Sequence, residues 1–298
     1  MNLFRSSRRR SALLLAILAP ALLSACIIDS NQSPFNPAGP VAEDQQNLFI
    51  FIFVIAVVVF VVVEAALLYS ILRFRHKGAP GKLPGQSHGN TRLEVGWTLI
   101  PVIILAVMAV PTLIMIAEQD AGPVDGRVPD NPLVIEGLGH QWWFEFAYPG
   151  EDVITANEIH IPVERAISIN LLSDDVIHSF WVPQLAGKVD MIPGKPNHMF
   201  FQSNEIGTFL GQCAEFCGEA HANMRFRVIV DSADDYQAWL DKMRRAPVSP
   251  EPGSDAAAGQ TVFAQNCSTC HTANSYNPAV ARAERDTQMA RQEAFKAD

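Results

Sequence analysis

Two long apolar stretches constrain the fold of this chain more than any other feature of its sequence. Residues 47–72 contain one charged side chain, Glu64, and residues 95–117 contain none. As an α-helix the first stretch would rise about 39 Å, enough to cross the hydrocarbon core of a bilayer with some tilt. The alternative is a buried hairpin in a soluble protein. Two such lengths in succession instead favour transmembrane helices at 47–72 and 95–117.

The N-terminus has the layout of a secretory signal. Four arginines precede an apolar run, and small residues follow before Cys26. The sequence LSAC, which ends at Cys26, resembles a bacterial lipobox, in which the cysteine is lipidated and becomes the mature N-terminus. We therefore expect a lipoprotein signal peptide at 1–25, lipidation of Cys26, and an extracytoplasmic segment at 26–46. The alternative is an ordinary signal cleaved nearby, with Cys26 incidental.

Charged loops predict the orientation of the two spans. The segment 73–94 carries five Lys and Arg and no acidic residue until Glu94, whereas residues 27–72 contain no Lys or Arg. Basic loops stay on the cytoplasmic side, so 73–94 is predicted to be cytoplasmic and residues 118–298 extracytoplasmic. The expected location is a bacterial inner (plasma) membrane, with both ends of the mature chain in the periplasm.

The extracytoplasmic part divides into a β-rich domain, a linker and a tail. Runs of β-branched and aromatic residues, broken by Gly, Pro, Asn and Asp, predict an all-β sandwich or barrel at 118–245 that closes with a helix capped by Asp or Ser. The segment 246–259 is rich in Pro, Gly, Ala and Ser, which indicates a linker, and 260–298 form a short tail. Residues 118–240 hold nineteen Asp and Glu against six Lys and Arg, a net charge of −13. We expect no nucleic-acid partner.

Residues 211–224 read GQCAEFCGEAHANM and gather soft metal ligands in one loop. A disulfide between Cys213 and Cys217 is one interpretation outside the cytoplasm, and a zinc site that adds His221 is another. Met224 favours copper, because structural zinc rarely uses a thioether, whereas copper electron-transfer sites combine histidine, thiolate and a weak axial methionine. A second thiolate can bridge a second copper ion. The second histidine must come from elsewhere, and His178, 35 residues before Cys213, is favoured over His140, His160 and His198.

The chain resembles subunit II of the cytochrome c oxidases, in the haem–copper oxidase family. The matching stretches are LEVGWTLIPVIILAVMAVPTL, GHQWWFEF, DDVIHSFWVP and GKVDMIPGKPNHMFFQSNEIGTFLGQCAEFCGEAHANM. The resemblance implies a cupredoxin-like domain with a CuA centre of two copper ions, bridged by Cys213 and Cys217. It further implies one histidine ligand for each copper, His178 and His221. Weak ligands would be Met224 and the backbone carbonyl of Glu215, whose carboxylate would help to hold magnesium at the interface with subunit I.

The same resemblance implies a role in respiration. Such a subunit is the electron-entry subunit of an enzyme: it takes electrons from cytochrome c and passes them to haem in subunit I, where oxygen reduction is coupled to proton pumping. Subunit III is a further expected partner. Trp142 would be the electron entry point, and Glu94 would lie at the entrance of a proton channel into subunit I. The alternatives are a copper-free quinol oxidase subunit II, which the complete ligand set disfavours, and a periplasmic copper-binding lipoprotein.

The tail carries the signature of a c-type haem. Cys267, Cys270 and His271 form a C-x-x-C-H motif, in which the cysteines attach the haem and the histidine binds its iron. Some relatives of the family have a cytochrome c domain fused at this place, and the residues before Cys267 predict its leading helix. Only 27 residues follow His271, so the segment 260–298 is expected to be incomplete. A truncated gene, or a disulfide between Cys267 and Cys270, remains the alternative.

Overall fold

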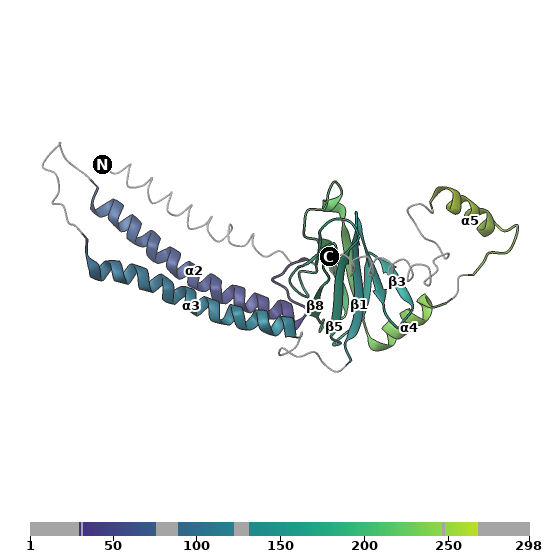
Figure 1. Ribbon diagram of the computed structural model, residues 1–298, viewed down its shortest axis with the longest axis horizontal. Helices are drawn as coiled ribbons and strands as arrows, with labels where there is room; N and C mark the ends of the chain where they lie inside the picture. The colour runs from purple at the N-terminus through teal and green to yellow at the C-terminus, as the bar shows by residue number, and fades with distance from the viewer. Residues whose placement is uncertain (1–29, 31, 76–88, 122–130, 246–247, 268–298) are drawn as a thin grey trace, which may run out of the picture.

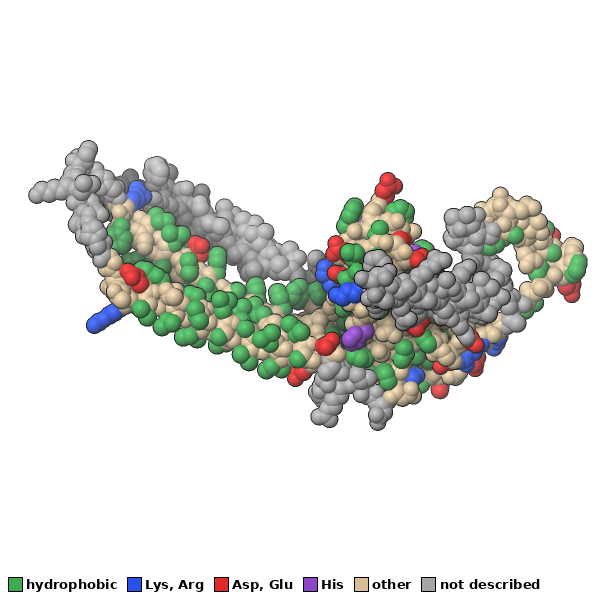
Figure 2. All heavy atoms as spheres, viewed as in Figure 1, with side chains coloured by type: hydrophobic (Ala, Val, Ile, Leu, Met, Phe, Trp, Pro, Cys, Tyr) green, Lys and Arg blue, Asp and Glu red, His purple; other side chains and the backbone are tan. Residues whose placement is uncertain are grey.

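The computed structural model describes residues 30, 32–75, 89–121, 131–245 and 248–267. Two long helices, α2 (Pro40–Arg73) and α3 (Thr91–Ala121), run side by side and lead to a β domain (Figure 1). Both are long and apolar enough to cross a membrane. Figure 2 shows hydrophobic side chains along the visible face of the hairpin. The predicted pair of spans is confirmed at this level.

Both helices extend beyond the predicted apolar stretches. With 34 residues, α2 is about 51 Å long, well over the roughly 30 Å hydrocarbon thickness of a bilayer. Its extra length lies at the polar N-terminal end, where Val41 and Ala42 are buried. The sequence prediction stopped where hydropathy falls, but the helix continues because its first turns pack on protein instead of lipid. Likewise, the segment 118–121, assigned above to the β domain, belongs to α3.

In the described part of the chain, ten strands form two five-stranded sheets. One sheet has the order β3-β2-β1-β5-β8, and the other β4-β10-β9-β6-β7. Most neighbours are antiparallel, but β1 and β5, and β4 and β10, are parallel pairs. The strands are β1 (Leu133–His140), β2 (Trp143–Tyr148), β3 (Val153–Ala156), β4 (Glu158–Pro162), β5 (Ile167–Ser173), β6 (His178–Trp181), β7 (Val189–Met191), β8 (Asn197–Phe201), β9 (Gly207–Cys213) and β10 (Arg225–Asp231).

The hydrophobic core lies between the two sheets, so of the two predicted architectures, sandwich or barrel, the structure has the sandwich. Alternate residues of β1 and β10 point inward, as the burial of Leu133 and Ile135, and of Phe226, Val228 and Val230, shows. An aromatic cluster of Phe144, Phe146, Phe180 and Phe226 fills the core, with ring centroids 4.8 to 6.2 Å apart in its contacting pairs. Phe144 is therefore a core residue.

Two short helices follow the sandwich. The first, α4 (Ala233–Met243), is capped by Ser232, whose side chain accepts a hydrogen bond from the Asp235 N–H. This confirms the predicted capped helix. The second, α5 (Asp255–Asn266), lies away from the β domain (Figure 1) and confirms a helix before Cys267. It starts within the predicted linker 246–259, because Ser254 caps it.

A buried histidine joins α4 to the sandwich. The His160 ring stacks on Trp239 at 4.3 Å, and its two nitrogens lie 2.7 Å from Asp231 and 3.1 Å from Glu158. Glu158 also pairs with Arg227 at 2.5 Å. Burial favours a raised pKa for Glu158, but the hydrogen bonds from His160 and Arg227 outweigh it and lower that pKa.

Replacing Glu158 with Gln is expected to remove a stabilisation that depends on pH. A carboxyl whose folded pKa is lowered contributes stability above its unfolded pKa, and this contribution is lost as pH falls through the folded pKa. Glu158→Gln should therefore melt below the wild type at neutral pH, and the gap should close as the pH falls through the lowered pKa of Glu158. Thermal unfolding of the detergent-solubilised chain measures it, with the exposed Glu205→Gln as control. A gap that stays constant with pH would contradict this account.

Candidate metal centre

Two neighbouring strands and one loop carry the sulfur and imidazole donors. β9 ends at Cys213, and the loop after it reaches Met224 just before β10. β9 and β10 pair, and the Cys213 N–H donates to the Met224 carbonyl at 3.0 Å, so the two ends of the loop are held together. β6 pairs with the other side of β9, with Phe180 opposite Cys213. This register brings His178, the first residue of β6, beside the start of the loop.

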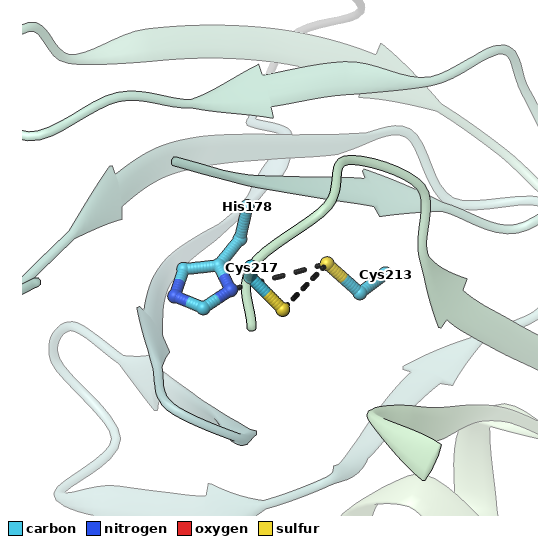
Figure 3. A group of neighbouring side chains, drawn as sticks. All are labelled: His178, Cys213 and Cys217. Atoms are coloured by element: carbon cyan, nitrogen blue, oxygen red, sulfur yellow. Dashed lines mark hydrogen bonds between the residues drawn. The ribbon is translucent and has the colours of Figure 1, made fainter. Parts of the chain in front are cut away.

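Five donor side chains meet at this end of the sheet. The Cys213 sulfur lies 3.8 Å from the Cys217 sulfur and 3.9 Å from Nδ1 of His178. The Cys217 sulfur lies 3.6 Å from Nδ1 of His221 and 3.7 Å from the Met224 sulfur. Figure 3 shows His178 and the two cysteines pointing toward one another. All five are buried except His221, which is half-buried. The residues expected from the sequence thus form one compact cluster.

The two cysteines are free thiols. Their sulfurs are 3.8 Å apart, whereas a disulfide bond is about 2.05 Å long. Each sulfur instead faces a different imidazole, Cys213 that of His178 and Cys217 that of His221. The arrangement is that of a ligand set, and the disulfide interpretation of this loop does not hold for the structure.

The thiols share a strong electrostatic coupling. Burial alone would raise the pKa of Cys213, but hydrogen bonds with His178 and with the backbone outweigh it and lower that pKa to about 6. Burial, and then the charge on Cys213, raises the pKa of Cys217 to about 12. The pair therefore gives up one proton easily and holds the second. A metal cation beside both sulfurs would compensate the second negative charge, so the site suits a soft cation that needs two thiolates.

Asp175 orients the first imidazole, and sequence analysis missed it. Nε2 of His178 lies 2.8 Å from the Asp175 carboxylate, which leaves Nδ1 to face Cys213. The Asp175 carboxylate also accepts the N–H groups of Gln141 and Val176, both at 2.6 Å. Such carboxylate–histidine pairs accompany metal-ligating histidines and fix their tautomer. The sequence feature that could have identified Asp175 is its position, an acidic residue three places before a candidate metal-ligating histidine.

Replacing Asp175 with Asn is expected to weaken metal binding about 10- to 100-fold, because the candidate ligand His178 stays but loses the carboxylate that orients its ring. Copper titration of the detergent-solubilised chain, followed by visible absorption, measures the affinity. Asp174→Asn is the matched control, because Asp174 pairs with His140 at 3.4 Å instead of with His178. Equal affinities of the Asp175→Asn and Asp174→Asn proteins would contradict the assigned role.

The backbone of Glu215 also faces the cluster. Its carbonyl oxygen lies 3.2 Å from the Cys213 sulfur, while its side chain is half-buried. The carbonyl is therefore placed beside the donor set, as a weak ligand would be.

Trp142 reaches the ligand loop from the opposite sheet. Its indole N–H donates to the Cys217 carbonyl at 3.0 Å, and the Gln141 side chain donates to the same oxygen at 2.8 Å. Gly218, at φ +116°, follows Cys217, and a Cβ there would lie 3.2 Å from the indole. The half-buried Trp142 thus touches the loop directly.

The other candidate histidines lie outside the cluster. His140 stacks on Trp143 at 4.4 Å, and His198 lies 3.9 Å from Asp120. His160 has both nitrogens engaged by carboxylates, as described above. Only His178 of the four candidates joins the cysteines in a potential metal-binding group of the described chain.

Glu94 lies in the first turn of α3, at the end of the hairpin remote from the β domain (Figure 1). Its carboxylate accepts the Asn90 N–H at 3.2 Å, and the Asn90 side chain accepts the N–H of Arg92 at 3.2 Å. The exposed Glu94 therefore helps to cap the helix. Of the remaining predicted sites, Cys267 is the C-cap residue that follows α5, whereas Cys26, Cys270 and His271 lie outside the described residues.

Comparisons with known proteins agree with this architecture. Residues 30–115 match the family model "Cytochrome C oxidase subunit II, transmembrane domain", and residues 151–232 match "Cytochrome C oxidase subunit II, periplasmic domain". Cytochrome c oxidase subunit 2 of Alkalihalophilus pseudofirmus is 38% identical over 253 residues, which cover 84% of this chain and 73% of that protein. Quinol oxidase subunit 2 of Bacillus spizizenii is 34% identical, over 77% of this chain and 71% of that protein.

Among solved structures, the periplasmic domain of subunit II of the cytochrome oxidase of Bradyrhizobium japonicum is 31% identical. The match covers 39% of this chain and 96% of that domain, with a TM-score of 0.38. The sequence relatives and the two family models carry the assignment. The chain belongs to the cytochrome c oxidase subunit II family.

Proposed function

We propose that this chain is the electron-entry subunit of a cytochrome c oxidase and holds a CuA centre. The observation that carries the proposal is the cluster of two thiols, two imidazoles and a thioether, in which each donor atom lies 3.6 to 3.9 Å from at least one other. Cys213 and Cys217 would bridge two copper ions. His178 and His221 would each bind one, and Met224 and the Glu215 carbonyl would be the weak ligands.

The donor set fits copper better than zinc. Two thiolates, two imidazoles and a thioether are the soft ligands that copper electron-transfer sites use. When bound, the two copper ions would supply a one-electron relay whose unpaired electron both metals share. The chain's own residues keep this site rigid: both cysteines are buried, and Asp175 holds the ring of His178. A rigid, water-excluded ligand set reduces the rearrangement that accompanies each electron.

The electron would enter from a cytochrome c and leave toward haem in subunit I, where oxygen is reduced and protons are pumped. Two observations support an entry role for Trp142: its ring is half-exposed, and its indole N–H donates to the Cys217 carbonyl. The strongly acidic domain would attract a basic donor, with a dependence on salt. We also propose that the chain contacts subunit III, that the Glu215 carboxylate helps to hold magnesium, and that Glu94 lies at the entrance of a proton channel. Two covalent modifications complete the proposal: lipidation of Cys26, and attachment of haem c to Cys267 and Cys270 with His271 as the iron ligand.

Replacing Trp142 with Phe is expected to slow reduction by cytochrome c roughly tenfold or more, as at an interface hot spot, and to leave the copper spectrum unchanged. The spectrum should persist because Gln141 still donates to the Cys217 carbonyl. Stopped-flow reduction of the assembled oxidase measures the rate. Trp143→Phe is the control, because Trp143 stacks on His140 and its ring has no described contact with the ligand loop. Equal rates in the two variants would contradict the entry role.

The ligand set separates this proposal from its two alternatives. A copper-free quinol oxidase subunit has no need for the five donors, yet all are present and converge. A periplasmic copper-binding lipoprotein would need neither the two long apolar helices nor Trp142 against the ligand loop.

One experiment tests the proposed centre. The whole chain, solubilised in detergent and loaded with copper, should bind two copper ions and be purple. Its EPR spectrum should show one unpaired electron coupled to two copper nuclei. A colourless protein, or a spectrum with coupling to one copper nucleus, would overturn the proposal. A haem stain after denaturing electrophoresis decides separately whether Cys267 and Cys270 carry haem.

A further inference from the structure

The chain just before α2 is built into the β domain. Ala38 is 4% exposed, its N–H donates to the Gln184 carbonyl at 2.8 Å, and its own carbonyl accepts the Asn204 N–H at 2.8 Å. The Gln184 side chain also donates to the Asn36 carbonyl at 2.8 Å. Both backbone groups of Ala38 are thus satisfied by the domain, so the segment lies in a fitted position instead of acting as a free linker.

Gly39 leaves no room for a side chain at this point. A Cβ on Gly39 would lie 1.9 Å from the Gln202 carbonyl oxygen, in backbone that cannot move aside like a flexible side chain. Its φ of −150° is ordinary extended backbone, so the glycine is needed for space alone. Pro40 starts the helix at the next residue, and Val41 is 4% exposed within the core of the domain. The helix therefore begins inside the domain.

A second set of contacts braces the same junction. The Gln45 side chain of α2 donates to Gln119 of α3 at 3.1 Å, and a Cβ on Gly187 would lie 2.8 Å from Gln45 Nε2. On the other side, Asp120 of α3 lies 3.9 Å from His198 of β8. Figure 1 shows the start of α2 and the end of α3 lying against the domain near β8. Contacts at several separated points restrain rotation as well as translation.

The junction connects directly to the elements that carry the donors. Gln184 lies three residues after β6, whose first residue is His178. At the other end of the segment, the side chain of Gln32 lies 3.5 Å from that of Gln212, the neighbour of Cys213. A displacement at Ala38 and Gly39 would therefore move the domain with its ligand loop, because sheet and loop form one packed unit.

We propose that Ala38 and Gly39 form a fixed joint that positions the metal centre over the membrane hairpin, and so sets its separation from the electron acceptor in the partner subunit. This inference rests on the proposed function. Electron transfer between fixed centres weakens steeply with distance, so a loosely tethered domain would spend most of its time too far from the acceptor. Gly39 is thus a positioning residue, which touches no metal ligand.

Gly39→Ala in the assembled oxidase tests the joint. We expect faster hydrogen–deuterium exchange around Ala38 and Asn204, an unchanged two-copper EPR spectrum, and an unchanged rate of reduction by cytochrome c. Electron transfer from the copper centre to haem, measured after flash photoreduction, should slow about tenfold or more, as small misplacements do in other reactions. Gly207→Ala is the matched control, since its Cβ would meet only the Phe209 ring at an ordinary 3.8 Å, and it should leave all four readouts unchanged.

Gln184→Leu tests the joint if the oxidase with Gly39→Ala does not assemble. It removes the side-chain bond to Asn36 but keeps the main-chain bond to Ala38, so a smaller slowing of the same step is expected. Faster exchange at the joint with an unchanged rate to haem would overturn the inference, as would a slowing that accompanies an altered EPR spectrum. Absence of the two-copper spectrum in the wild type would instead overturn the proposed function.

Discussion

Cys217→Ser is expected to abolish the two-copper spectrum and to remove electron transfer through this subunit. Cys217 lies among three other donors, because its sulfur lies within 3.8 Å of those of Cys213 and Met224 and of Nδ1 of His221. Serine is nearly the same size, but a hydroxyl holds its proton at neutral pH and is a poor ligand for a soft metal. The bound copper should fall from two ions per chain to one or none.

The loss should be specific to the ligand, not to the fold. Cys213 and His178 remain close to each other in the variant, so a residual single-copper spectrum fits the prediction. Ala222→Ser places the same hydroxyl on an exposed residue of the same loop and should keep the purple colour and both copper ions. Metal analysis and EPR of the two variants measure the difference. A Cys217→Ser protein that still couples one electron to two nuclei would contradict the bridging assignment.

The sequence predicted the parts of this molecule whose signals are local. Hydropathy located both membrane helices, and the ligand loop holds four of the five donors within twelve residues, from Cys213 to Met224. His178 was favoured among four histidines by its position 35 residues before Cys213. The structure supplies the physical reason, since the strand that carries it pairs with the strand that ends at Cys213. Runs of β-branched and aromatic residues broken by turn residues were enough for an all-β sandwich or barrel, although not to choose between the two or to order the strands.

Other features depend on residues that are distant in the sequence. No pattern near Gly39 indicates that the Gln202 carbonyl lies where its Cβ would be, because the two meet only after β8 takes its place in the sheet. The hydrogen bond from Trp142 to Cys217 likewise joins opposite sheets. The start of α2 was placed too late for a related reason, since its polar first turns are stabilised by the domain and carry no hydropathic signal.

Phe226→Ala is expected to cost roughly 3–5 kcal/mol of folding free energy, which is a large part of the about 5–15 kcal/mol that stabilises a typical domain. Phe226 is 4% exposed, and its ring lies 4.8 Å from that of Phe180 and 4.9 Å from that of Phe144. It also covers Gly211, where an added Cβ would come within 2.3 Å of the ring. Truncation would open a cavity that these rigid neighbours cannot close.

The cavity would lie near the strands that carry the donors. Phe226 comes two residues after Met224, and Phe180 is opposite Cys213 in the sheet. Phe216→Ala is the matched control: the same side chain is removed from the ligand loop, but Phe216 is 76% exposed and contributes little to the core. Thermal unfolding without copper should show a large fall in melting temperature for Phe226→Ala alone. Copper should raise both melting temperatures, since it binds the folded form. Equal losses in the two variants would mean that the aromatic cluster is not what holds the ligand strands in register.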